Sequence, residues 1–221
     1  MQSDIEHVYH DTEWGRPLHD ERRLFEMLVL EGVQAGLSWR TVLARRGHYR
    51  AAFDGFDIDR IAGYDLGRVE RLLGDSGIIR NRAKIEAVVA NARACVRMRE
   101  AGEPFGAWMW AQVGGAPQLP EWRHPQDVPA KTAQSARISR DLRQRGFCFV
   151  GPVIVNSFLK ATGMVNAHLQ DCPRQAECRR AWIRWEASRH ARFAPLAAQG
   201  SRPILGVSPQ TDAPCFPIPL S

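Results

Sequence analysis

DERRLFEMLVLEGVQAGLSW, residues 20–39, is the stretch that decides the fold of this 221-residue chain. Asp20 is suited to cap a helix, because a short acidic side chain can accept a hydrogen bond from a free amide of the first turn. Apolar residues then follow at helical spacing, so that one stripe holds Leu24, Met27 and Leu28. The pattern predicts a core helix that the rest of the chain covers.

Glu31 lies one turn past Leu28 on the same stripe, where Gly32 allows the backbone to turn out of the helix. A carboxylate on an apolar face is costly unless something binds it. Two explanations are open at this point. Glu31 caps a neighbouring helix or pairs with a buried arginine, or it forms the polar floor of a ligand pocket with Trp39 as an aromatic wall.

The composition is that of a globular protein, with 44% hydrophobic residues and enough length for one compact domain or two small lobes. No apolar run is long enough to span a bilayer. The first residues, MQSDIEHVYHD, lack the apolar core of a secretory signal. We therefore expect a cytoplasmic protein without a membrane segment.

The formal net charge of +6 favours an anionic partner, and nearly all of the positive charge comes from arginine. The five cysteines are an odd number, which argues against a disulfide framework in a cytoplasmic protein. Metal binding or burial is the expected use of the cysteines.

The remaining chain also has helical periodicity. Ser38 is expected to cap a helix that ends near Arg46, with Gly47 as its stop, and residues 54–59 are expected to be a loop. Asp65 opens a helix that buries Leu66, and a tight turn at residues 74–80 leads to a long helix from Asn81. Further helices are expected over residues 103–113, over residues 132–145 with a basic exposed face, and from Pro152. No segment is typical of a strand, so the predicted fold class is all-α.

The C-terminal part differs in composition. Residues 179–202 hold six arginines against one glutamate without a clear apolar period, and the sequence from Pro203 is rich in proline and serine. We therefore predict one domain over residues 1–179. Residues 180–221 are predicted to be a basic and then proline-rich tail with little core and poor order.

Six ordered motifs resemble the 3-methyladenine DNA glycosylase I family. They are YHDTEWG at 9–15, LFEMLVLEGVQAGLSW at 24–39, GIIRNRAKI at 77–85, NARA at 91–94, RGFCFVG at 145–151 and VNAH at 165–168. The resemblance implies the all-α fold of the helix-hairpin-helix glycosylase superfamily. It also implies base excision repair by hydrolysis of the N-glycosidic bond of 3-methyladenine, with double-stranded DNA containing alkylated adenine as the partner and a monomer as the working form.

The resemblance assigns roles to individual residues. Tyr9 and Glu31 are implied to contact the edge of the base, while Trp39 and Trp14 are implied to bind its rings. A base methylated at N3 is cationic and leaves easily, so the enzyme has to flip it out of the stack and hold it. A carboxylate favours that positive charge. We expect base recognition, more than activation of water, to be the catalytic role of Glu31.

A structural zinc ion is also implied, with His10, His168 and Cys172 as its ligands. The family normally begins with a segment that supplies a cysteine as the fourth ligand, and this chain starts after that point. Cys178 or a water molecule could complete the site, or the site could be empty. The position of a second tyrosine of the family is Glu6 here.

The turn GIIRNRAKI is the expected DNA clamp, because a helix N-terminus offers free amides to a phosphate and Arg80, Arg82 and Lys84 add charge. A merely solvated basic turn is the alternative. Leu37 lies between Gly36 and Ser38, where it could wedge into the duplex or simply pack. Gln34 is a second candidate for a contact with the opposite strand.

Two other functions are considered. Lys84 could form a Schiff base in a bifunctional glycosylase and lyase, although a lysine in a basic turn is poorly placed for this chemistry. The chain could also be a non-catalytic DNA-binding or damage-sensing derivative of the same fold.

Overall fold

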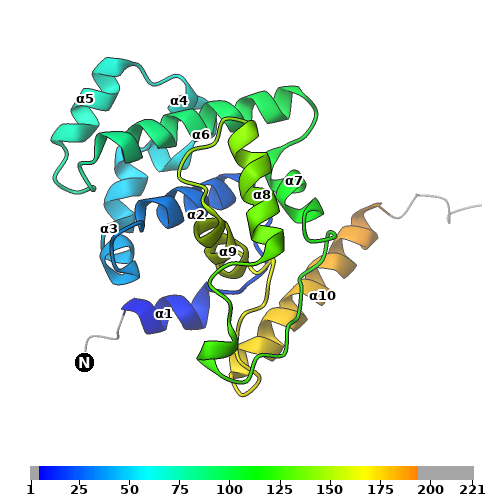
Figure 1. Ribbon diagram of the computed structural model, residues 1–221. Coiled ribbons are helices and arrows are strands. Elements are labelled where there is room, and N and C mark those ends of the chain that lie inside the picture. The colour runs from blue at the N-terminus through cyan, green and yellow to red at the C-terminus, as the bar shows by residue number, and fades with distance from the viewer. Residues whose placement is uncertain (1–4, 194–221) are drawn as a thin grey trace, which may run out of the picture.

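The computed structural model describes residues 5–193, and the regular secondary structure of this part of the chain consists of helices joined by loops (Figure 1). An isolated bridge between Gln118 and Val165 is the one β-type pairing within it. The predicted all-α class is therefore confirmed. The elements within the described range are α1 (Ile5–Thr12), α2 (Glu21–Val33), α3 (Trp39–Ala52), η1 (Asp54–Phe56), α4 (Ile58–Ala62), α5 (Leu66–Gly74), α6 (Arg82–Glu100), α7 (Phe105–Ala111), η2 (Pro125–Asp127), α8 (Ala133–Gln144), α9 (Pro152–Ala161) and α10 (Pro173–Phe193).

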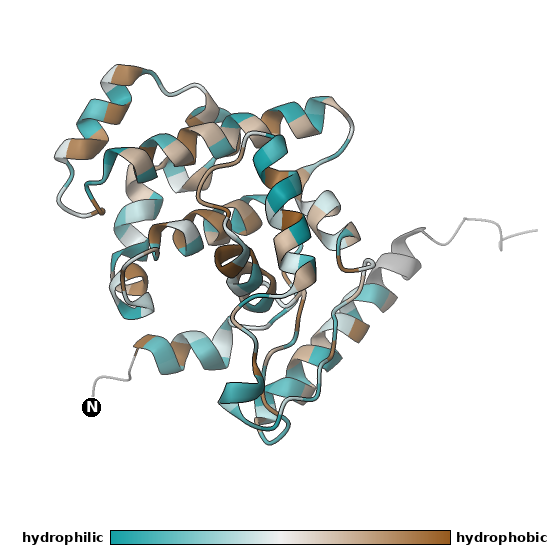
Figure 2. Cartoon of the chain, viewed as in Figure 1, coloured by the Kyte–Doolittle hydropathy of each residue, from teal (hydrophilic) through white to brown (hydrophobic). Residues whose placement is uncertain are grey.

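Helix α2 is the centre of the domain, as the sequence predicts. The Asp20 side chain accepts a hydrogen bond from the Arg23 amide at 2.9 Å, and every residue from Leu24 to Val33 is buried. A helix buried on all sides must be covered from several directions. Helices α3, α6, α7 and α9 pack against α2, and the apolar residues of α9 lie beside it at the centre of the molecule (Figure 2).

Helix α3 is longer than expected, and the prediction that it stops at Gly47 is wrong. Ser38 does cap the helix, but the helix continues through Gly47 to Ala52. A glycine inside a helix costs only about 1 kcal/mol, which burial of the following turn can offset. Arg46 and Tyr49 are both buried on either side of Gly47.

The expected loop at residues 54–59 is also wrong, since it contains η1 and the start of α4. The Asp57 side chain caps α4, which buries Ile58 and Ile61. In α5 the predicted cap Asp65 is confirmed, but Leu66 is 77% exposed instead of buried. Leu66 is the first residue of α5, and the residues of this helix that reach the core, Val69 and Leu72, lie in its later turns.

The long helix α6 begins directly after Asn81, as expected, and the Asn81 side chain caps it. Thr132 caps α8, and Pro152 is the first residue of α9. Within the described residues, no helix has the length and apolar character needed to cross a membrane.

Helix α10 corrects the predicted tail, because the expected boundary near residue 180 lies inside this helix. Trp182 is 8% exposed and stacks on Trp110, with ring centroids 5.4 Å apart, and on Trp185 at 5.0 Å. The ring of His19 stacks on Trp185 at 3.5 Å. Two tryptophans in an arginine-rich stretch therefore attach α10 to the domain. Residues 194–221 of the predicted tail lie outside the described residues.

Replacing Trp182 with alanine is expected to lower the free energy of unfolding by about 3 kcal/mol, because the change removes a large buried side chain. Ile183 is the matched control. It is the next residue of α10 and is 54% exposed, so Ile183→Ala should change stability by less than about 0.5 kcal/mol. Urea unfolding of the full chain measures both values. Equal effects of the two substitutions would show that α10 is not anchored through Trp182.

Candidate functional site

A cavity of about 370 Å³ opens between the N-terminal helices and α9. Its size is that of a small-molecule site. It brings together four segments that are far apart in the sequence: α1, the end of α2 with the following loop, the loop before α8, and α9. The residues that line it are Glu6, Tyr9, His10, Trp14, Glu31, Gln34, Trp39, Val128, Ser157 and Lys160.

Glu31 lies in the wall of this cavity and is 6% exposed. Burial raises the pKa of its carboxyl to about 8, against the opposing effect of the positive charge of Lys160. It accepts no hydrogen bond from any residue in the described part of the chain. Such a carboxyl is costly to the protein alone, and a donor or a cation in the cavity would relieve that cost.

A buried glutamate paired with arginine does occur in α2, but at Glu26. The Arg46 Nε donates to Glu26 Oε1 at 2.6 Å, and the Arg50 Nε donates to the same atom at 2.9 Å. Arg46 also reaches Glu13 at 2.8 Å. The arginine-pair explanation considered for Glu31 therefore applies to its neighbour one and a half turns earlier, while Glu31 faces the cavity.

Tyr9 and Trp39 form an aromatic wall, with ring centroids 5.3 Å apart and ring planes inclined by 56°. The Tyr9 hydroxyl and the Trp39 Nε1 are both buried, and neither has a hydrogen-bond partner among the described residues. Burial raises the pKa of Tyr9, so its hydroxyl stays protonated and able to donate. Two unpartnered polar atoms beside Glu31 indicate a polar, flat ligand.

Lys160, Ser157 and Val128 line the cavity without having been predicted from the sequence. Lys160 Nζ donates to the carbonyl of Pro129 at 2.8 Å, and burial lowers the pKa of this lysine. Ser157 and Lys160 are one turn apart on α9, in a helix that otherwise supplies core residues. A serine and a lysine three residues apart in an otherwise apolar helix were the sequence feature from which these two cavity residues could have been predicted.

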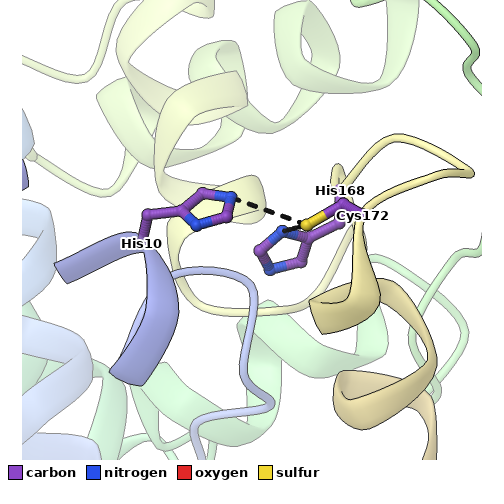
Figure 3. A group of neighbouring side chains, drawn as sticks. All are labelled: His10, His168 and Cys172. Carbon is purple, nitrogen blue, oxygen red and sulfur yellow. Dashed lines mark hydrogen bonds between the residues drawn. The ribbon is translucent and has the colours of Figure 1, made fainter. Parts of the chain in front are cut away.

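His10, His168 and Cys172 come together although the first lies more than 150 residues from the others (Figure 3). Their ligand atoms all lie within 4.8 Å of one another. The Cys172 Sγ is 3.5 Å from His168 Nδ1 and 3.9 Å from His10 Nε2. These separations suit three donors of a tetrahedral metal site.

His168 is already oriented for this purpose. Its Nε2 lies 3.0 Å from the carbonyl oxygen of Trp14, so Nε2 carries the proton and Nδ1 is free to bind a metal. The ring lies against Gly15, where a Cβ would come within 2.7 Å of Nε2. Cys178 is buried but does not belong to the cluster, so it does not supply the fourth ligand in this arrangement.

Trp14 connects the two sites. Its ring lines the cavity, stacks on the His10 ring with centroids 5.7 Å apart, and meets the edge of His168 at 4.7 Å. The cluster therefore holds the wall of the cavity that α1 provides.

The residues predicted to contact DNA lie around the α5–α6 turn and the loop after α2. Arg80 is exposed, while Arg82 pairs with Glu70 at 2.8 Å and with Glu86 at 3.6 Å. Lys84 does not project into solvent as expected, because its Nζ donates to two backbone carbonyls of residues 33 and 35. Arg82 and Lys84 are thus engaged within the protein, whereas Arg80 forms no ion pair with any residue between 5 and 193.

Gln34 and Leu37 belong to the loop between α2 and α3. Gln34 lines the cavity, and Leu37 is half-exposed beside it. Gly36 has a φ of +77°, a value that favours glycine, and nothing lies within 4 Å of where its Cβ would be. The loop is therefore a narrow, open turn at the edge of the cavity.

Comparisons with known proteins agree on one family. The family model described as methyladenine glycosylase matches residues 1–175. DNA-3-methyladenine glycosylase 1 of Escherichia coli K12 is 47% identical over 165 residues, which cover 75% of this chain and 88% of the relative. The DNA-3-methyladenine glycosylase of Haemophilus influenzae is 44% identical over 165 residues, covering 75% and 89%.

A solved structure of 3-methyladenine DNA glycosylase I from Staphylococcus aureus, described as giving the structural basis of 3-methyladenine recognition, superposes with a TM-score of 0.77. It is 36% identical, and the match covers 79% of this chain and 93% of that one.

Glu31→Gln is expected to stabilise the protein, and more so as the pH rises. The pKa of Glu31 is higher in the folded protein than in the unfolded chain, so the wild type loses stability as the pH rises from about 5 to about 8. Glutamine has no charge to bury, and at pH 9 the variant should be more stable by about 1–2 kcal/mol. At pH 5 the difference should be small. Thermal unfolding across this pH range measures the effect.

Glu26→Gln is the matched control on the same helix. It leaves Arg46 and Arg50 without their shared carboxylate, so it should destabilise the protein by about 3 kcal/mol. A Glu31→Gln variant that is less stable than the wild type at pH 9 would contradict the assignment of an uncompensated carboxyl.

Proposed function

This chain belongs to the methyladenine glycosylase family, and from this premise we propose that it is a monofunctional DNA glycosylase. It hydrolyses the N-glycosidic bond of 3-methyladenine in alkylated DNA, in the first step of base excision repair. The observation that carries the proposal is the buried Glu31 carboxyl, which lies among aromatic rings and has no hydrogen-bond partner within the described residues.

The charge of the substrate explains why such a carboxyl is useful. A purine methylated at N3 is cationic, and a cation beside Glu31 lowers the pKa of the carboxyl and stabilises its ionised form. Neutral adenine does not stabilise the ionised form, so Glu31, whose pKa burial raises to about 8, stays mostly protonated at neutral pH and offers adenine no charge attraction. The cost that Glu31 imposes on the empty protein thus becomes discrimination in favour of the damaged base.

The rings hold the base from its sides. Trp39 and Trp14 offer faces for stacking and for attraction to the cationic ring, and the Tyr9 hydroxyl can donate to a ring nitrogen. The leaving group needs little protonation because its bond to the sugar is already weakened. Recognition of the flipped base by Glu31 and Tyr9 is therefore the main catalytic contribution.

Contact with double-stranded DNA is proposed at the turn between α5 and α6, in the manner of a helix-hairpin-helix clamp. The N-terminus of α6 and the exposed Arg80 face the same region and together suit a phosphate. Leu37 and Gln34, at the edge of the cavity, are placed to fill the space that the flipped nucleotide leaves. We further propose that the protein works as a monomer in the cytoplasm.

A structural zinc ion is proposed at His10, His168 and Cys172. The spacing of the three donor atoms and the free Nδ1 of His168 support this ligand set. The ion would supply a fixed link between α1 and the segment before α10, and the chemistry of base release would not pass through it.

Glu31→Gln should reduce the release of 3-methyladenine from alkylated duplex DNA by roughly a hundredfold, because loss of a charged partner costs a few kcal/mol. The measurement is the rate at which free base appears at saturating enzyme. Glu103→Gln, at an exposed glutamate that does not line the cavity, is the control and should retain the wild-type rate. A wild-type protein that binds the DNA but releases no base would instead support the non-catalytic alternative.

Metal analysis of protein purified without chelator should find about one zinc ion per chain. Addition of a chelator should lower the melting temperature, because the link between α1 and residues 168–172 is lost. Cys172→Ser should bind less zinc, whereas Cys148→Ser, at an exposed cysteine outside the cluster, should bind the wild-type amount. Protein that contains no zinc, and that Cys172→Ser leaves equally stable, would falsify the site.

A further inference from the structure

Lys84 joins two parts of the protein that the proposed function uses separately. It lies in the first turn of α6, directly after the turn proposed to bind phosphate. Its Nζ donates to the carbonyl of Val33 at 2.8 Å and to the carbonyl of Ala35 at 2.6 Å. One side chain therefore connects the N-terminus of α6 with the C-terminus of α2.

The two carbonyls belong to a helix end that needs such a donor. The last carbonyls of a helix have no amide partner within it, and a cation near them is stabilising. At this helix end the amides of Gln34 and Ala35 donate to the carbonyls of Leu30 and Gly32. Within the described chain, the carbonyls of Val33 and Ala35 accept hydrogen bonds from the Lys84 ammonium instead. Burial lowers the pKa of Lys84, in agreement with an ammonium held against the protein.

The loop that Lys84 holds has few other supports. Leu37 donates its amide to the Gln34 carbonyl at 2.7 Å, which closes a tight turn around Gly36. Open space surrounds Gly36, and Ala35 is exposed. The position of Leu37 and Gln34 relative to α6 therefore depends on the two hydrogen bonds from Lys84.

The other end of this connection is the phosphate-binding turn itself. The Asn81 side chain accepts from the Lys84 amide at 3.1 Å and so fixes the first turn of α6. Lys84 thus has its backbone in the cap of α6 and its ammonium on the loop. The side chain of Lys84 therefore links the turn to the loop directly.

We propose that Lys84 is a positioning residue that couples the α5–α6 turn to the loop carrying Gln34 and Leu37, so that phosphate binding places this loop for entry into the duplex. The proposal rests on the proposed glycosylase function. It assigns Lys84 neither a direct phosphate contact nor a covalent bond to the sugar. Lys84→Met keeps the length of the side chain and removes its donors, while Lys84→Arg keeps donors and charge.

Arg93 provides a matched control on the same helix. Its Nε donates to the Ala62 carbonyl at 2.9 Å and its Nη2 to the Tyr64 carbonyl at 2.8 Å, at the end of α4. Arg93→Met therefore removes the same kind of link between α6 and a helix C-terminus, but at a site outside the cavity and the DNA-binding turn.

The first measurement is single-turnover release of 3-methyladenine from duplex DNA. Lys84→Met should be slower by at least about tenfold because misplacement of a positioning group is costly, Lys84→Arg should recover most of the loss, and Arg93→Met should stay within about twofold of the wild type. Affinity for free 3-methyladenine, by calorimetry, should be unchanged in Lys84→Met. A Lys84→Met rate within about twofold of the wild type, or an equal loss of free-base affinity, would overturn the proposal.

The second measurement separates coupling from direct phosphate binding. The salt dependence of DNA affinity should keep its slope in Lys84→Met, whereas Arg80→Met should reduce the slope by about one. A reduced slope in Lys84→Met would make Lys84 a phosphate ligand and overturn the proposal. Borohydride trapping of the wild type on damaged DNA that is lost in Lys84→Met would also overturn it, in favour of a Schiff base at Lys84.

The third measurement does not depend on activity. Hydrogen exchange of the free protein should be faster at the Leu37 amide in Lys84→Met than in the wild type, with no change in the middle of α6. Unchanged exchange at Leu37 would show that Lys84 does not hold the loop. If the wild type releases no 3-methyladenine, the proposed function fails, yet this exchange result still decides whether the tether exists.

Discussion

Helix α2 is buried along its whole length from Leu24 to Val33, and this constraint determines much of the surrounding structure. Its polar side chains are almost fully buried, so each of them needs an interaction with another group to offset the loss of hydration. Glu26 accepts hydrogen bonds from Arg46 and Arg50, and these ion pairs hold α3 against α2. The Glu31 carboxyl has no such arginine and lines the cavity. The same helix thus carries one carboxylate that pairs with arginines of α3 and one that lines the cavity.

The cavity is made by segments that have no sequence proximity, and each is held by its own contact. Helix α1 is fixed from the far end of the chain, through the hydrogen bond between His168 and the Trp14 carbonyl and through the cluster with Cys172. The loop after α2 is fixed from α6 through Lys84. Helix α9 supplies Lys160 and is held by the Pro129 carbonyl. The shape of the cavity therefore depends on contacts between residues outside its lining as well as on the residues that line it.

Local signals predicted the caps at Asp20 and Ser38 correctly, because a capping side chain acts within its own turn. The family resemblance placed Tyr9, Glu31 and Trp39 together, which spacing alone cannot do across thirty residues. Prediction failed where tertiary packing overrode a local signal: the helix passes through Gly47, and Trp182 anchors a stretch whose arginines suggested a tail. The engagement of Lys84 was likewise invisible, because its acceptors lie about fifty residues earlier in the chain.

The hydrogen bond between His168 and Trp14 joins residues 154 positions apart, and this distance has a consequence for the order of synthesis. A ribosome completes α2, with its buried carboxyl, long before it adds the histidine that fixes α1. During that interval the emerging chain has the floor of the cavity but lacks one fixed wall. Contacts between residues so far apart in the sequence form late in folding. Bringing the two residues together costs chain entropy before the contact contributes any stabilisation. The link that fixes α1 is therefore complete only after residues in the last quarter of the polypeptide have been added.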